Sequence, residues 1–275
     1  MFWTRLASGI VLVIIALAAL SFGGIPLAVV LWAISLVALR ELTKALKCAA
    51  DAKKLNLLEI LGMAGVTAYY LCLYFSENHT LLLMCIVGFF LLEMLAYVVT
   101  FPKFRSEQVT AVVFSFLYAP VMLSFMYLTR ASAQGLYMVW MILISSWGCD
   151  TCAYVVGMLI GKKKIFPLLS PKKSLEGCIG GVLGAALIGW LYGHFFVENA
   201  FPDQTVSALI AVICGVGSIM SMVGDLAASA IKRNNDIKDY GRLIPGHGGI
   251  MDRFDSVIVT APMTYFLTVL LFTTV

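Results

Sequence analysis

Charged residues are scarce in this sequence. Lys, Arg, Asp and Glu make up 12% of the 275 residues, whereas 61% are hydrophobic and the mean hydropathy is +0.96. Soluble globular chains contain about 45–50% apolar residues, so an ordinary soluble domain is excluded. The chain also lacks low-complexity tracts and convincing internal repeats. The composition therefore indicates a membrane protein.

Long apolar runs recur along the whole chain, and a spanning helix needs about 20 mostly apolar residues. The runs cover residues 6–22, 25–39, 57–75, 81–100, 109–128, 136–160, 178–197, 205–230 and 256–275. The run at 25–39 is short, so a hairpin of tilted or partly re-entrant helices remains open there. Membrane strands would give shorter, alternating segments. The sequence predicts an all-α polytopic membrane protein with about nine transmembrane helices.

Basic residues indicate the orientation, because Lys and Arg accumulate in short cytoplasmic loops. If the runs cross the membrane in turn, all of the 19 Lys and Arg residues except Arg130 fall on the side of the N-terminus. We therefore expect a cytoplasmic N-terminus. A signal peptide cleaved near Ala16-Leu17-Ala18 is the alternative. An uncleaved first helix is favoured, because the second apolar run follows so closely.

The seven cysteines include one C-x-x-C pair, Cys149 and Cys152, which could suggest redox or metal chemistry. No second pair or His cluster accompanies it, and it lies in an apolar run. We interpret these two residues as small buried hydrophobic side chains and expect no disulfide.

The two halves of the chain differ in their polar residues. We assign residues 1–135 to about five N-terminal transmembrane helices and 136–275 to a catalytic region. The largest N-terminal loop, 40–54, carries four charges at helical spacing: Arg40, Glu41, Lys44 and Lys47. We expect it to form a solvated cytoplasmic helix near anionic lipid head groups. Glu93, inside the fourth run, is interpreted as a helix-packing residue.

Asp225 lies near the end of the eighth run. A carboxylate near membrane depth is costly, so it usually lines a polar cavity and has a partner. If the helix continues, one face carries Ser221, Asp225, Ser229 and Lys232. The alternative is structural, with Asp225 capping a helix break or pairing with an Arg of a neighbouring helix.

Polar chemistry is densest at residues 229–255, between two apolar runs. Asp252 and Asp255, three residues apart, can share one helical face and offer the oxygen ligands that magnesium prefers. Capping of the ninth helix is the alternative, and it is strongest for Asp255. The glycines that flank His247 allow backbone N–H groups to approach phosphate. The basic residues Lys232, Arg233, Lys238 and Arg242 suit phosphate binding, with membrane anchoring as their alternative.

A second polar cluster precedes the seventh run. Asp150 lies inside an apolar run, and Lys172, Lys173, Ser174 and Glu176 follow on the predicted cytoplasmic side. We interpret the cluster as a second wall of one phosphate site, although Ser174 and Glu176 could simply cap the next helix. The patterns Gly157-x-x-x-Gly161 and Gly180-x-x-x-Gly184 are expected to let helices approach closely.

Residues 229–255 resemble the signature of the phosphatidate cytidylyltransferase (CDP-diacylglycerol synthase) family. That signature reads Ser-x-apolar-Lys-Arg, four residues, Lys-Asp-x-Gly, then Pro-x-His-Gly-Gly-apolar-x-Asp-Arg-apolar-Asp, and every fixed position is met. The resemblance is sharp over about 145–256, including Gly224-Asp225-Leu226 and Ser170-Pro171-Lys172-Lys173-Ser174. Ser174 replaces the more usual Thr and keeps the hydroxyl.

The resemblance implies conversion of CTP and phosphatidate to CDP-diacylglycerol and pyrophosphate at a cytoplasmic-face site in the bacterial inner membrane. It also implies Mg²⁺ in a two-metal site, with K⁺ as the candidate second ion, and a homodimer. The metal aspartates correspond to Asp225 and Asp252. Catalytic roles fall on Asp225, Asp252, Lys232, Arg233 and His247. Substrate contacts fall on Asp150, Lys172, Lys173, Ser174, Glu176, Ser229, Lys238, Asp239, Gly248, Gly249, Arg253 and Asp255.

Two other functions were weighed, and we expect no nucleic-acid partner. A CDP-alcohol phosphotransferase would show an Asp-Gly-x-x-Ala-Arg run, which is absent. A small membrane anion transporter would carry its polar residues near the membrane midplane, often in paired repeats. Here they gather at one predicted membrane face. This distribution favours the synthase, and the transporter is kept as the alternative.

Overall fold

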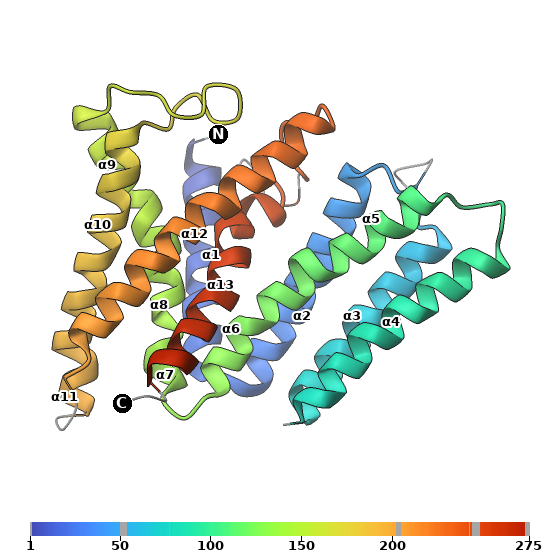
Figure 1. The fold of residues 1–275 in the computed structure, drawn as a ribbon, viewed down its shortest axis with the longest axis horizontal. Coiled ribbons are helices and arrows are strands. Elements are labelled where there is room, and N and C mark those ends of the chain that lie inside the picture. Colours follow the sequence, from blue (N-terminus) through green and yellow to red (C-terminus); the bar gives the residue numbers. More distant parts are fainter. Residues whose placement is uncertain are drawn as a thin grey trace. The chain divides into compact units, whose positions relative to one another are not determined.

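Helices form the regular structure of the protein (Figure 1). The computed structural model describes residues 2–49, 54–76, 78–201, 205–241, 243 and 248–272. Within this part, eight helical segments are long and apolar enough to cross a membrane, and α1 (Phe2–Phe22) precedes them. An isolated bridge between Lys164 and Ser174 joins two extended residues. The predicted all-α polytopic membrane fold is confirmed.

Contacts between the helices divide the chain into two compact units. Unit 1 comprises Met1–Tyr127 and Asn235–Arg253, and unit 2 comprises Leu128–Asn234 and Phe254–Val275. The division predicted at residue 135, between N-terminal helices and a catalytic region, stays a prediction. Asn235–Arg253, however, groups with the N-terminal helices. Residues far apart in sequence therefore build unit 1.

Unit 1 is built mainly from spanning helices that follow one another in sequence. After α1 come α2 (Gly24–Ala45), α3 (Leu57–Phe75), α4 (His79–Val99), α5 (Ser106–Phe116) and the π-helical segment η1 (Leu117–Val121). Because α2 is 22 residues long, the short apolar run belongs to a full-length helix, and a re-entrant hairpin is not formed there. Pro120 lies inside η1, where its missing N–H disturbs the regular helical pattern.

The solvated helix expected at 40–54 is wrong for the end of α2, where Arg40 is half-buried and Glu41 is buried, whereas Lys44 and Lys47 are exposed as expected. Residues 50–53 of that range lie outside the described residues. Glu41 is 7% exposed and Thr43 is 1% exposed. Arg40 pairs with the carboxylate of Glu59, which also accepts a 2.9 Å hydrogen bond from the Thr43 hydroxyl. These polar residues continue the helix inside the protein because each has an internal partner.

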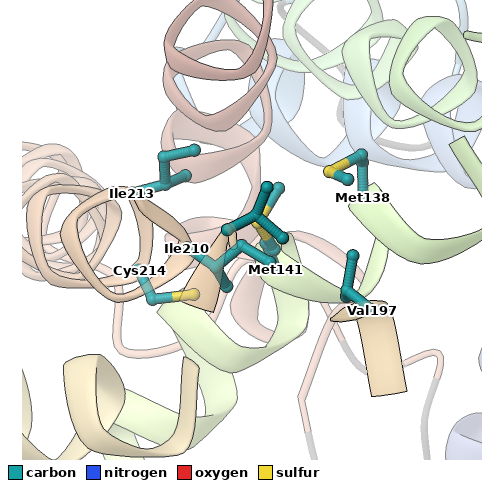
Figure 2. Packing of buried hydrophobic residues seen from close by; sticks show 7 residues of the cluster. Met138, Met141, Val197, Ile210, Ile213 and Cys214 are labelled. Atoms are coloured by element: carbon teal, nitrogen blue, oxygen red, sulfur yellow. The ribbon is translucent and has the colours of Figure 1, made fainter. Parts of the chain in front are cut away.

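Unit 2 has its own buried core, and the first and last of its helices begin in unit 1. After α6 (Met122–Ala131) come α7 (Gly135–Met138), α8 (Trp140–Leu143), η2 (Ile144–Gly148), α9 (Cys149–Ile160), α10 (Leu175–Tyr192), η3 (Gly193–Val197), α11 (Glu198–Ala200), α12 (Ser207–Asn234) and α13 (Met251–Phe272). The core cluster contains Met138, Met141, Val197, Val206, Ile210, Ile213 and Cys214 (Figure 2). It joins α7, α8, η3 and α12, so these elements hold one another in place.

Small residues bring α9 and α10 together, as the glycine patterns predicted. A side chain at Gly181 would place its Cβ 3.0 Å from both the Cβ of Ala153 and the Sγ of Cys149. At Gly184, the added Cβ would lie 2.5 Å from the Sγ of Cys152. The interpretation as a small buried side chain is confirmed for Cys149, which is fully buried, whereas Cys152 is half-buried. The close contact positions α9 against the helix that follows the second polar cluster.

Gly181→Leu is expected to destabilise the protein by about 1–3 kcal/mol, the usual cost of overpacking a close contact. The leucine would have to displace α9 or distort α10. Gly88→Leu is the matched control, because no atom lies within 4 Å of an added Cβ at Gly88. Thermal unfolding in detergent measures both variants, and equal unfolding temperatures would contradict the close α9–α10 contact.

Candidate active site

Asp225 is the centre of an electrostatic cluster in unit 2. It lies on α12, which continues through Lys232 as the predicted polar stripe requires. Its Oδ2 forms a 2.5 Å ion pair with the Nζ of Lys173, and both side chains are partly exposed. Among the described residues, the ion pair recorded for Asp225 is therefore with a Lys and not with the Arg of the structural alternative. The partner of Asp225 is Lys173, which lies in the loop before α10.

Two further aspartates interact with Asp225. Asp150 on α9 and Asp255 on α13 both experience repulsion from its carboxylate. Lys173 attracts Asp150, and Lys232 attracts Asp255. We call these five residues the acid–lysine cluster. The cluster thus combines three carboxyl groups with two ammonium groups, and carboxylate oxygens are also ligands for divalent cations.

A cavity of about 280 Å³ adjoins this cluster within unit 2. Its lining includes Asp150, Tyr154, Met158, Lys172, Lys173 and Ser174. Tyr154 is 69% exposed and Met158 is 66% exposed on a helix that is apolar enough to span a membrane. The cavity therefore combines two lysines with an apolar wall, a combination that suits an anionic head group carrying an apolar tail.

Ser174 and Glu176 organise the loop that carries the two lysines. Ser174 is the N-cap of α10, and its hydroxyl accepts a 3.2 Å hydrogen bond from the Gly177 amide. Glu176 accepts hydrogen bonds from the amides of Lys162 and Lys163 at 3.0 and 3.2 Å. The capping alternative is thus realised for Ser174, while its substrate contact stays a prediction. Because these bonds tie the loop to α10, Lys172 and Lys173 are held at the cavity.

Asp252 occupies the first turn of α13 in unit 1. It is 9% exposed, and its Oδ2 accepts hydrogen bonds from the amides of Tyr240 and Gly249 at 2.8 and 3.1 Å. Gly248 has a φ of +84°, a conformation that favours glycine. Its added Cβ would also lie 3.0 Å from Asp252 Oδ2. Gly248 of the signature therefore packs closely against the carboxylate of Asp252, and a larger residue at position 248 would press on that carboxylate.

The other predicted site residues divide between the two units. Ser229 and Lys232 are half-buried on α12 in unit 2, and Arg233 is exposed at the end of that helix. In unit 1, Lys238 and Asp239 are exposed and line a cavity of about 650 Å³ with Lys44 and Tyr240. Arg253 is exposed in the first turn of α13. His247 and Arg242 lie outside the described residues.

The structure thus brings together Asp150, Lys173, Asp225, Lys232 and Asp255 in unit 2. In unit 1 it brings together Asp239, Tyr240, Gly248, Gly249 and Asp252. Among the described residues, no three His, Cys, Asp or Glu side chains are grouped as a ready metal site. Magnesium often takes only one or two carboxylates and fills its octahedron with waters and substrate phosphates, so the aspartates still fit such an ion.

Glu41 is a residue that sequence reasoning missed. Its carboxylate accepts hydrogen bonds from the amides of Ile250 and Met251, 209 and 210 residues away. A charged residue two positions beyond an apolar run is an ambiguous signal, because a solvated loop gives the same pattern. The buried contact is visible only in the fold.

Comparisons with known proteins show the family of the chain. A phosphatidate cytidylyltransferase of Bacillus subtilis (strain 168) is 30% identical over 270 residues, which are 96% of each chain. One of Staphylococcus haemolyticus (strain JCSC1435) is 31% identical over 269 residues, which are 96% of this chain and 97% of the relative. The model of the cytidylyltransferase family matches residues 3–271. The chain therefore belongs to the cytidylyltransferase family.

Proposed function

We propose that this protein transfers the cytidylyl group of CTP to phosphatidate, forming CDP-diacylglycerol and pyrophosphate. Family membership and the names of the relatives support a cytidylyl transfer to this lipid. The observation that carries the proposal is the acid–lysine cluster beside a cavity with two lysines and an apolar wall. A water-soluble acceptor would not require that wall to lie on a membrane-spanning helix.

The cavity matches the two parts of phosphatidate. Lys172 and Lys173 suit its phosphate monoester, because ammonium groups bind phosphate as compact charges. The exposed side chains of Tyr154 and Met158 provide apolar surface for the acyl chains. We therefore propose that the lipid enters sideways from the bilayer with its phosphate beside Asp225 and Lys173.

The reaction needs little help from a general base. A phosphate monoester is mostly dianionic at neutral pH, because its second pKa is about 6. A phosphatidate oxygen attacks the α-phosphorus of CTP, a new P–O bond forms, and the bond to the β-phosphate oxygen breaks to release pyrophosphate. The main barrier is repulsion between anions. Lys173 and Lys232 lower this barrier by neutralising phosphate charge near the carboxylates.

A bound Mg²⁺ fits the chemistry of the donors. The Asp225 carboxylate already holds a cation, the Lys173 ammonium, at 2.5 Å, and carboxylate oxygens are preferred magnesium ligands. We propose, as the family resemblance implies, that Asp225 and Asp252 are each magnesium ligands, with K⁺ as the candidate second ion. The metal would supply positive charge to the developing pyrophosphate. Asp150 and Asp255 would orient the surrounding lysines.

We further propose that the site faces the cytoplasm of a bacterial inner membrane, where CTP is available. The one-sided distribution of Lys and Arg supports this orientation. A homodimer is proposed from the family resemblance.

The purified protein in detergent is expected to form CDP-diacylglycerol from CTP and phosphatidate with Mg²⁺, and to stop when EDTA removes the metal. Product is measured by mass spectrometry of the lipid extract. Diacylglycerol, which lacks the attacking phosphate, is the control acceptor and should give no product. A folded protein that forms no product with both substrates would contradict the proposal. Phosphate flux into proteoliposomes would instead support the transporter.

A further inference from the structure

Glu41 makes a buried connection between α2 and the start of α13. Its Oε2 accepts a 2.8 Å hydrogen bond from the Met251 amide, and its Oε1 accepts a 3.2 Å bond from the Ile250 amide. The side chain is 7% exposed. All three residues belong to unit 1. A helix from the N-terminal part of the chain thus contacts the C-terminal signature directly.

The contact satisfies a general requirement of helices. The first amides of a helix have no partner within that helix, and a nearby Ser, Thr, Asn or Asp usually accepts from them. Here the first residue of α13, Met251, donates to a carboxylate from a distant helix. Negative charge is favourable at this end of a helix, so the buried carboxylate is compensated.

Two signature glycines make room for Glu41. A Cβ added at Gly241 or at Gly249 would contact the Glu41 carboxylate too closely. The amide of Gly249 also donates to Oδ2 of Asp252 at 3.1 Å. Gly249 therefore lies between the two carboxylates, with Glu41 against its Cα and Asp252 bonded to its amide. Moving Glu41 would disturb the backbone that holds Asp252.

We propose that Glu41 is a positioning residue for Asp252. It fixes residues 249–251, and this backbone holds the Asp252 carboxylate in place. The inference rests on the proposed function, in which Asp252 acts in cytidylyl transfer. It also assigns a role in the active site to α2, a helix outside the signature.

Hydrogen exchange measured by mass spectrometry tests the contact without using activity. In Glu41→Ala and the milder Glu41→Gln, amides of residues 249–252 should exchange about tenfold faster or more, as expected when a local hydrogen-bonded unit opens more often. Glu59→Gln is the control, because Glu59 is also a buried carboxylate of unit 1 but binds Arg40 and Thr43. In the Glu59→Gln variant, amide hydrogen exchange should change at residues 40–59 only. Unchanged exchange at 249–252 in both Glu41 variants would overturn the proposal.

Kinetics test the positioning role. Glu41→Gln should lower kcat by about 10-fold to 100-fold, the range expected for a small misplacement of a catalytic group, with an unchanged KM for phosphatidate. Glu59→Gln should retain kcat per folded molecule. Normal kcat in Glu41→Gln together with faster exchange would overturn the role for Asp252. An inactive wild type would instead contradict the proposed function, and the exchange result would still test the contact.

A double-mutant cycle gives an independent readout of the same contact. Gly249→Ala should strongly lower kcat in the wild-type background, because its methyl group meets the Glu41 carboxylate. In the Glu41→Ala background, the same substitution should have a much smaller effect. Equal effects in the two backgrounds would overturn the fitted contact between Glu41 and Gly249.

Discussion

Asp225→Asn is expected to lower kcat for CDP-diacylglycerol formation by about 100-fold to 1,000-fold, the usual cost of losing one preorganised electrostatic group. Asparagine keeps the shape of the side chain but not its charge. The ammonium of Lys173 would lose its 2.5 Å partner, and Asp150 and Asp255 would lose a neighbouring charge. Initial rates at saturating CTP, phosphatidate and Mg²⁺ measure the effect.

The control for this variant is Asp236→Asn. Asp236 is exposed and has a φ of +56°, a backbone conformation that asparagine also tolerates. Its activity should match that of the wild type. This control separates loss of a particular carboxylate from a general effect of removing one negative charge.

A second substitution distinguishes chemistry from simple charge balance. If Asp225 only neutralises Lys173, Asp225→Asn/Lys173→Met should be as active as Lys173→Met alone, because no ammonium group remains to be neutralised. If Asp225 acts on the substrates or their metal, the double variant should be much less active than Lys173→Met. Equal activity of the double variant and Lys173→Met would contradict the catalytic assignment of Asp225.

Apolar periodicity was enough to predict the membrane fold, because each spanning helix is encoded by a local run of residues. The helix at 57–75 begins and ends at the predicted residues. The end of α2 could not be located in this way. Charges after Leu39 resemble the start of a loop, yet Arg40 and Glu41 continue the helix because distant residues provide their partners.

For the candidate site too, the sequence predicts local features but not the contacts between distant segments. Asp225 was expected to have a partner from its depth in an apolar run, and Lys173 proves to be that partner. Their pairing across 52 positions of sequence depends on how α9, α10 and α12 pack, which no local pattern contains. Capping by Ser174 was foreseen as an alternative because it involves neighbours in sequence. Contacts between distant segments, such as that of Glu41, required the structure.

Asp252→Asn should distinguish a metal ligand from a residue that only holds the backbone in place. One carboxylate oxygen of Asp252 accepts hydrogen bonds from the Tyr240 and Gly249 amides, and an asparagine side-chain oxygen can accept the same bonds. The variant should therefore fold normally, with an unfolding temperature close to that of the wild type.

Loss of charge should nevertheless lower kcat by about 100-fold or more if Asp252 holds Mg²⁺ beside the CTP phosphates. Binding provides a readout that does not depend on turnover. A non-hydrolysable CTP analogue with Mg²⁺ should raise the unfolding temperature of the wild type, because a ligand that binds the native state stabilises it, and the increase should be smaller in Asp252→Asn. If the variant keeps both wild-type activity and full stabilisation, Asp252 only holds the backbone at Tyr240 and Gly249, and the magnesium must be held by the aspartates of unit 2.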